Sequence, residues 1–99
     1  QSLPASSAEQ LGLSRHLKVI GALFYGAHWC PACARQKALF GEQAIKTLPY
    51  VECDKVAEDR ERCQAAGIKA FPTWVLYGKE RLEGVQSLDE LKIWSGYSR

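Results

Sequence analysis

The sequence of 99 residues contains no methionine, and no apolar run in it is long enough to cross a membrane. The longest apolar stretch, Val19 to Tyr25, is far shorter than the roughly 20 residues that a membrane-spanning helix requires. We therefore expect no direct insertion of this domain into a membrane. The absence of methionine indicates a processed protein or a domain excised from a longer one, so upstream segments are expected to be missing.

The chain also lacks a long run of one charge sign. Its 13 basic and 11 acidic residues give a formal net charge of +2, which excludes the electrostatic footprint of a nucleic-acid-binding protein. With 46% hydrophobic residues and three tryptophans, a chain of this length can bury one core. We expect a linker over residues 1–5 and one monomeric domain over residues 6–99. The scattered lysines are typical of a solvated surface; they are Lys37, Lys46, Lys55, Lys69 and Lys79.

Helix and strand signals alternate along the chain. Capping boxes predict the starts of the first and last helices, at Ser6–Glu9 and at Ser87–Glu90, and glycine stops are predicted at Gly67 and Gly96. The predicted order is a helix over 6–18, a strand over 19–25, a helix over 31–46, a strand over 50–53, a helix over 54–66, strands over 73–77 and 80–83, and a helix over 87–96.

This order of elements predicts a three-layer α/β sandwich. A helical crossover joins the first two strands, which makes them parallel, whereas the short turn at Gly78-Lys79 makes the last two antiparallel. We expect a central mixed sheet of about four strands flanked by helices, with an extra helix at the N-terminus.

Two cysteines stand three positions apart, at Cys30 and Cys33, where a buried strand is followed by a helix that Pro31 opens. The spacing permits a disulfide, and the unpaired N–H groups of the helix N-terminus favour the thiolate of Cys30. Cys33, one turn deeper, should be more buried and less acidic. The pair predicts thiol-disulfide exchange, with Cys30 as the exchanging sulfur, Cys33 as its partner and no cofactor in this domain.

A CxxC motif is also found as half of a zinc site or as an inert structural bridge. Its context favours exchange, because Trp29 precedes the motif and Phe71-Pro72 stands before another buried strand. A four-thiolate zinc site that also uses Cys53 and Cys63 is disfavoured, since that second pair lacks the short spacing of zinc fingers. We predict no metal site.

At these residues the sequence resembles the thioredoxin family, whose WCxxC motif and later cis-proline loop correspond to Trp29–Cys33 and to Pro72. The resemblance implies that Pro72 is cis and lies against the CxxC motif. It also implies that the Phe71 backbone pairs with an extended substrate segment. Trp29, Phe71 and Pro72 are therefore predicted to bind substrate.

The sequence departs from thioredoxins proper in two places. Where they carry a buried acidic residue, six positions before the first motif cysteine, this chain has Phe24. The residues between the cysteines are Pro31-Ala32 rather than Gly-Pro, and in this family those positions tune the reduction potential. Both departures favour an oxidase or isomerase over a reductase. His28 either helps to stabilise the Cys30 thiolate or is an exposed loop residue without a role.

The second cysteine pair, Cys53 and Cys63, stands ten positions apart. An even number of cysteines in a small domain suits an oxidising compartment and favours a structural disulfide here. Such a bridge would stabilise the fold by about 2 to 3 kcal/mol for a loop of this length. A relay in which this pair exchanges with the CxxC motif is the alternative.

Longer strings carry a closer resemblance: YGAHWCPACARQKALFGEQA, YVEC, FPTWVLYGK, GVQSLDEL and the closing SGY. They are similar to the thioredoxin-like domain that follows the membrane-spanning, quinone-reducing domain of bacterial, cyanobacterial and plant vitamin K epoxide reductase homologues. The resemblance implies a dithiol oxidase in the periplasm or thylakoid lumen, tethered to a membrane. It would accept electrons from client proteins with cysteine pairs and pass them to the membrane domain, which holds the quinone.

Two other functions stay open at this point. A free-standing reducing thioredoxin would use the same two cysteines in the opposite direction. A redox-silent binding module would keep the fold and lose the exchange, although the intact CxxC motif argues against it.

Overall fold

A computed structural model of the chain describes residues 3–98. Residues 1 and 2 of the predicted linker and residue 99 of the predicted domain lie outside the described residues. The elements, in chain order, are α1 (Ala8–Val19), β1 (Leu23–Gly26), α2 (Pro31–Ala38), α3 (Gly41–Ala44), the 3-10 turn η1 (Ile45–Thr47), β2 (Tyr50–Glu52), α4 (Ala57–Ala66), β3 (Thr73–Val75), β4 (Leu82–Glu83) and α5 (Leu88–Ser95).

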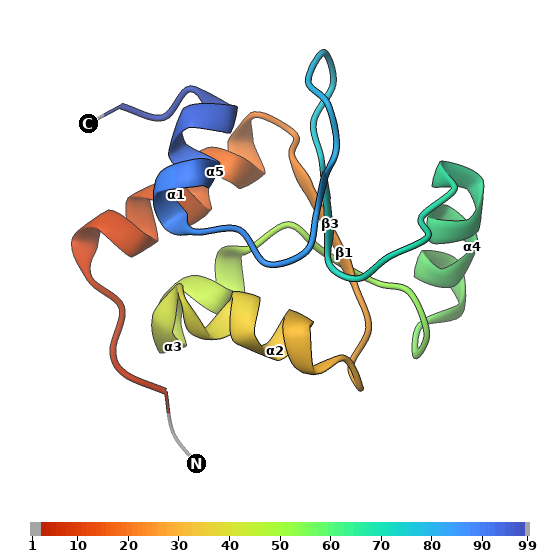
Figure 1. The fold of residues 1–99 in the computed structure, drawn as a ribbon. Helices are drawn as coiled ribbons and strands as arrows, with labels where there is room; N and C mark the ends of the chain where they lie inside the picture. The colour runs from red at the N-terminus through yellow and green to blue at the C-terminus, as the bar shows by residue number, and fades with distance from the viewer. Residues whose placement is uncertain (1–2, 99) are drawn as a thin grey trace.

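Within residues 3–98 the strands form one mixed four-stranded sheet in the order β2-β1-β3-β4. Strand β1 pairs in parallel with β2 and antiparallel with β3, and β3 pairs antiparallel with β4. Helices α1, α2, α3 and α5 lie on one side of the sheet, and α4 lies on the other (Figure 1). The predicted thioredoxin-like three-layer fold is confirmed, with α1 as the extra N-terminal helix.

The larger core lies on the side of the sheet that α1, α3 and α5 cover. Phe24 of β1 and Trp74 of β3 stack there with ring centroids 4.7 Å apart, and Trp94 of α5 packs edge-on against Trp74 at 6.4 Å. Phe24 and Trp74 are fully buried, and burial of such large apolar rings is the main favourable term in folding. Phe24 therefore acts as a packing residue at the place where thioredoxins proper carry their acidic residue.

The N-cap of the first helix lies one residue later than predicted. Its N-cap is Ser7, which forms a capping box with Gln10, so the predicted box at Ser6–Glu9 is wrong. The Ser6 side chain is used elsewhere: its hydroxyl donates to the Phe40 carbonyl and accepts from the Ala44 N–H. The second predicted capping box, at Ser87–Glu90, is confirmed.

The first strand is shorter than predicted, because its predicted first residues belong to α1 and to a turn. Val19 is the last residue of α1 and is 84% exposed, whereas Leu17 is fully buried. The Ile20 and Ala22 N–H groups donate to carbonyls of the last turn of α1, so the strand begins only at Leu23. The apolar run therefore spans a helix end, a turn and a strand.

The helix predicted over residues 31–46 is broken after Ala38. The chain turns at Phe40 and restarts as α3 at Gly41, whose φ of +84° is a left-handed conformation that favours glycine. Ser6 lies so close that a Cβ on Gly41 would stand 2.7 Å from its Oγ and 2.9 Å from its Cα. The Glu42 N–H also donates to the Pro4 carbonyl. The N-terminal segment thus packs into the break between the two helices.

Gly41→Ala is expected to lower the free energy of unfolding by about 2 kcal/mol or more, because it adds backbone strain and a clash with the Ser6 backbone. Gly21→Ala is the matched control. Gly21 also has a positive φ, of 86°, but a Cβ there meets nothing within 4 Å. Chemical denaturation should show the larger loss for Gly41→Ala, and equal losses would contradict the role of Ser6 in this contact.

Candidate functional site

The two CxxC cysteines lie where β1 leads into α2. Cys30 is the N-cap of α2, with extended backbone angles, and its sulfur accepts a hydrogen bond from the Cys33 N–H at 3.2 Å. Pro31 occupies the first helical turn, as predicted, where its missing N–H has no partner to lose. The sulfur thus takes the place that a serine or aspartate oxygen usually holds at a helix start.

Cys33 lies deeper than Cys30. It is 1% exposed, against 7% for Cys30, and burial raises the pKa of the Cys33 thiol to about 12. A hydrogen bond with Cys30 contributes in the same direction. The predicted difference in burial between the two thiols is confirmed. Such a pair suits exchange, in which the outer sulfur is attacked and the inner one leaves.

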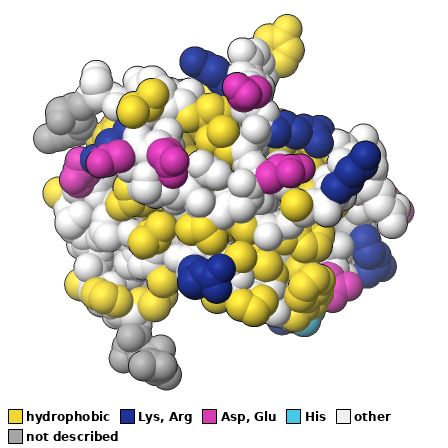
Figure 2. Space-filling model, in the orientation of Figure 1, with side chains coloured by type: hydrophobic (Ala, Val, Ile, Leu, Met, Phe, Trp, Pro, Cys, Tyr) yellow, Lys and Arg dark blue, Asp and Glu magenta, His cyan; other side chains and the backbone are white. Residues whose placement is uncertain are grey.

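The loop before β3 reaches the same place. The Phe71–Pro72 peptide bond is cis, and the Cys30 thiol donates to the Phe71 carbonyl at 3.8 Å. The Trp29 ring is 58% exposed and stands edge-on to the Phe71 ring, with centroids 5.8 Å apart. The structure therefore brings together Trp29, Cys30, Cys33 and Phe71, with Pro72 fully buried directly after Phe71. Hydrophobic side chains gather on the surface over this end of α2 (Figure 2).

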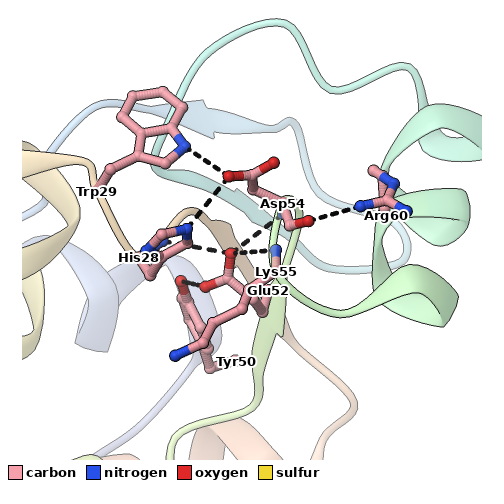
Figure 3. A network of polar contacts seen from close by, with 7 residues as sticks. All are labelled: His28, Trp29, Tyr50, Glu52, Asp54, Lys55 and Arg60. Atoms are coloured by element: carbon pink, nitrogen blue, oxygen red, sulfur yellow. Dashed lines mark hydrogen bonds and ion pairs between the residues drawn. The ribbon is translucent and has the colours of Figure 1, made fainter.

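A polar network ties the loop before Cys30 to the segment after β2 (Figure 3). Asp54 Oδ2 accepts from the Trp29 indole N–H and lies 3.1 Å from Nε2 of His28. His28 is thus an exposed loop residue with an acidic partner, and Trp29 is held by a carboxylate. Asp54 carries no signal in the sequence that would point to this role, because it stands 25 positions after Trp29 and belongs to no motif.

Glu52, the last residue of β2, is the buried member of that network. One carboxylate oxygen accepts from the backbone N–H groups of His28, Asp54 and Lys55, and the other accepts from the Tyr50 hydroxyl at 2.7 Å. Burial alone would raise the pKa of Glu52, but the bonds from Tyr50 and from the backbone outweigh it and hold the pKa below its usual value. The predicted helix over 54–66 therefore begins late, at Ala57, because residues 54 and 55 turn around this carboxylate.

Cys53 and Cys63 form a disulfide, with an S–S distance of 1.98 Å and a Cα–Cα distance of 5.6 Å. The bridge joins the end of β2 to α4 and packs in a cluster on the opposite face of the sheet from the large core. The CxxC cysteines form a separate cluster with Ala27. The structural role of this bridge stays a prediction, and so does the alternative of a relay with the CxxC motif.

No group of three or more His, Cys, Asp or Glu side chains among residues 3–98 is arranged to hold a metal ion. In the same part of the chain, none of the helices has both the length and the apolar character needed to cross a membrane.

No family model matches the chain. The chain is 41% identical over 99 residues to the thiol-disulfide oxidoreductase LTO1 of Arabidopsis thaliana. This alignment covers 95% of the present chain but 26% of the relative, so the chain spans about a quarter of that protein's length. The likeness and the cysteine pair at the start of α2 together support redox activity.

Proposed function

We propose that this chain is a dithiol oxidase domain that introduces disulfides into client proteins. The observation that carries the proposal is the pairing of an N-capping Cys30 sulfur with a buried, weakly acidic Cys33. Phe71 and the exposed Trp29 provide a backbone edge and an apolar surface beside that sulfur, which suits an extended client segment.

The exchange proceeds in two balanced steps. A client thiolate attacks the Cys30 sulfur of the Cys30–Cys33 disulfide, the S–S bond breaks, and its electron pair leaves on Cys33, which takes up a proton. The second client thiolate then attacks the client sulfur of the mixed disulfide, and Cys30 leaves as a thiolate. The client gains a disulfide, and the chain keeps two electrons as a dithiol.

The partner that removes these electrons is proposed to be a membrane-embedded, quinone-reducing domain of the vitamin K epoxide reductase type, in the periplasm or thylakoid lumen. Support comes from the resemblance of the longer sequence strings. The length of the plant relative is a second support, because about three quarters of that protein lies outside the alignment with this chain. The disulfide between Cys53 and Cys63 suits an oxidising compartment.

The reduction potential of the Cys30–Cys33 couple tests the direction of electron flow. Equilibration in a glutathione series, with alkylation of Cys30 and Cys33 read by mass spectrometry, should give a value nearer to the roughly −120 to −180 mV of oxidases and isomerases. Counting only these two thiols keeps the second disulfide out of the measurement. A value near the roughly −270 mV of thioredoxin would instead identify a reducing protein and contradict the oxidase proposal.

A further inference from the structure

The inner sulfur of the CxxC motif faces an aromatic ring across a glycine. A Cβ on Gly26 of β1 would stand 2.9 Å from Cys33 Sγ, 2.9 Å from Tyr50 Cε1 and 3.4 Å from the Tyr50 hydroxyl oxygen. The sulfur and the edge of the ring therefore approach each other over the one residue type that leaves room for both. Tyr50 is the register neighbour of Phe24 on β2, so the fold places this ring directly behind the motif.

A lysine ammonium is held on the face of that ring. Lys37 follows Cys33 by four positions on α2, which places both side chains on one face of the helix, and its Nζ lies 3.8 Å from the centroid of the Tyr50 ring. The hydroxyl of Tyr50 donates to Glu52, which fixes the ring at its other end. Lys37 is therefore half-buried beside the motif, whereas the sequence suggested a lysine of the solvated surface.

We propose that the Lys37 ammonium, positioned on Tyr50, stabilises the negative charge that develops on the Cys33 sulfur when the Cys30–Cys33 disulfide opens. The inference rests on the proposed exchange function and names a residue that governs the rate of that exchange. In this step an attacking thiolate bonds to Cys30, the S–S bond breaks, and the electron pair passes to Cys33, so one negative charge moves inward towards Lys37.

The charges around Cys33 support this role. Burial and Cys30 raise the pKa of Cys33, whereas a backbone hydrogen bond with Ala27 and, to a smaller extent, the charge of Lys37 act in the opposite direction. From β2 the groups that face this region are Tyr50, whose pKa is raised by burial and by Glu52, and Glu52 itself. The Glu52 carboxylate accepts four hydrogen bonds from other groups. The Lys37 ammonium on the Tyr50 ring is therefore the positive charge that we expect to stabilise the departing thiolate.

Lys37→Met is expected to slow reduction of the Cys30–Cys33 disulfide by glutathione about three- to tenfold at pH 7, since loss of a nearby positive charge makes Cys33 a poorer leaving group. Reoxidation by glutathione disulfide should slow by the same factor, because Cys33 is neutral in the reduced protein and charged only in the transition state. The reduction potential should therefore stay unchanged, whereas structural damage to the motif would move it.

Matched variants complete the test. Lys37→Arg, which keeps the charge, should retain the wild-type rate, and so should Lys46→Met, which removes an exposed lysine. Tyr50→Leu should slow the reaction as much as Lys37→Met, and the double variant should be no slower than either. A wild-type rate in Lys37→Met, or an equal loss in Lys46→Met, would overturn the inference and leave the exchange function standing. A wild-type disulfide that glutathione does not reduce would overturn both.

Discussion

Cys33→Ser should trap clients on Cys30 as mixed disulfides, and two-electron exchange should fall by at least about a thousandfold. Cys30 retains its place at the start of α2, where its sulfur accepts the hydrogen bond from residue 33 through the backbone N–H, which the substitution does not change. What is lost is the inner thiol that would release the adduct. Incubation with an oxidised client, followed by mass spectrometry without reductant, measures the adduct on Cys30.

Cys30→Ser is the control that separates chemistry from folding. Serine is a good N-cap, so α2 should keep its start and the melting temperature should change little. Exchange should fall as far as in Cys33→Ser, but no adduct should form, because Cys33 is 1% exposed and its thiol is a weak acid. Adducts of equal yield on Cys33 would reverse the assigned roles. Unchanged biological output in Cys30→Ser would favour a redox-silent binding module.

The order of helices and strands could be predicted because its signals are local. Short apolar runs, the glycine stop at Gly67 and the capping box at Ser87–Glu90 each involve residues within a few positions of each other. The errors arose where distant segments meet. The break at Gly41 depends on Ser6, 35 positions earlier, and a continuous run of helix-forming residues gives no sign of that contact.

The same distinction separates the two halves of the candidate site. Trp29, Cys30 and Cys33 belong to one motif, and Phe71-Pro72 has its own local signature, so all of them could be named from the sequence. Residues of β2 lie near the motif because β2 pairs in parallel with β1, which places Glu52 opposite Gly26. Pairing the predicted strands 19–25 and 50–53 in the correct register would have placed Tyr50 and Glu52 beside the motif. The predicted start of the first strand was wrong, however, because β1 begins at Leu23.

Glu52→Ala is expected to lower the free energy of unfolding at pH 7 by about 3 kcal/mol, the second large effect that the structure predicts. The substitution leaves the Tyr50 hydroxyl and the N–H groups of His28, Asp54 and Lys55 without their acceptor. Glu61→Ala, at an exposed position on α4, is the matched control and should change stability by less than about 0.5 kcal/mol. Guanidinium denaturation followed by tryptophan fluorescence gives both values.

The pH dependence of this loss tests its cause. Because folding lowers the pKa of Glu52, its stabilisation is fully present above the unfolded value of about 4.3 and is lost as pH falls through the folded value. The gap in stability between wild type and Glu52→Ala should therefore be widest near pH 7 and should narrow below pH 4. A gap that stays constant down to pH 3 would mean that packing of the Glu52 side chain, and not its ionised carboxylate, holds the loop before Cys30 against β2.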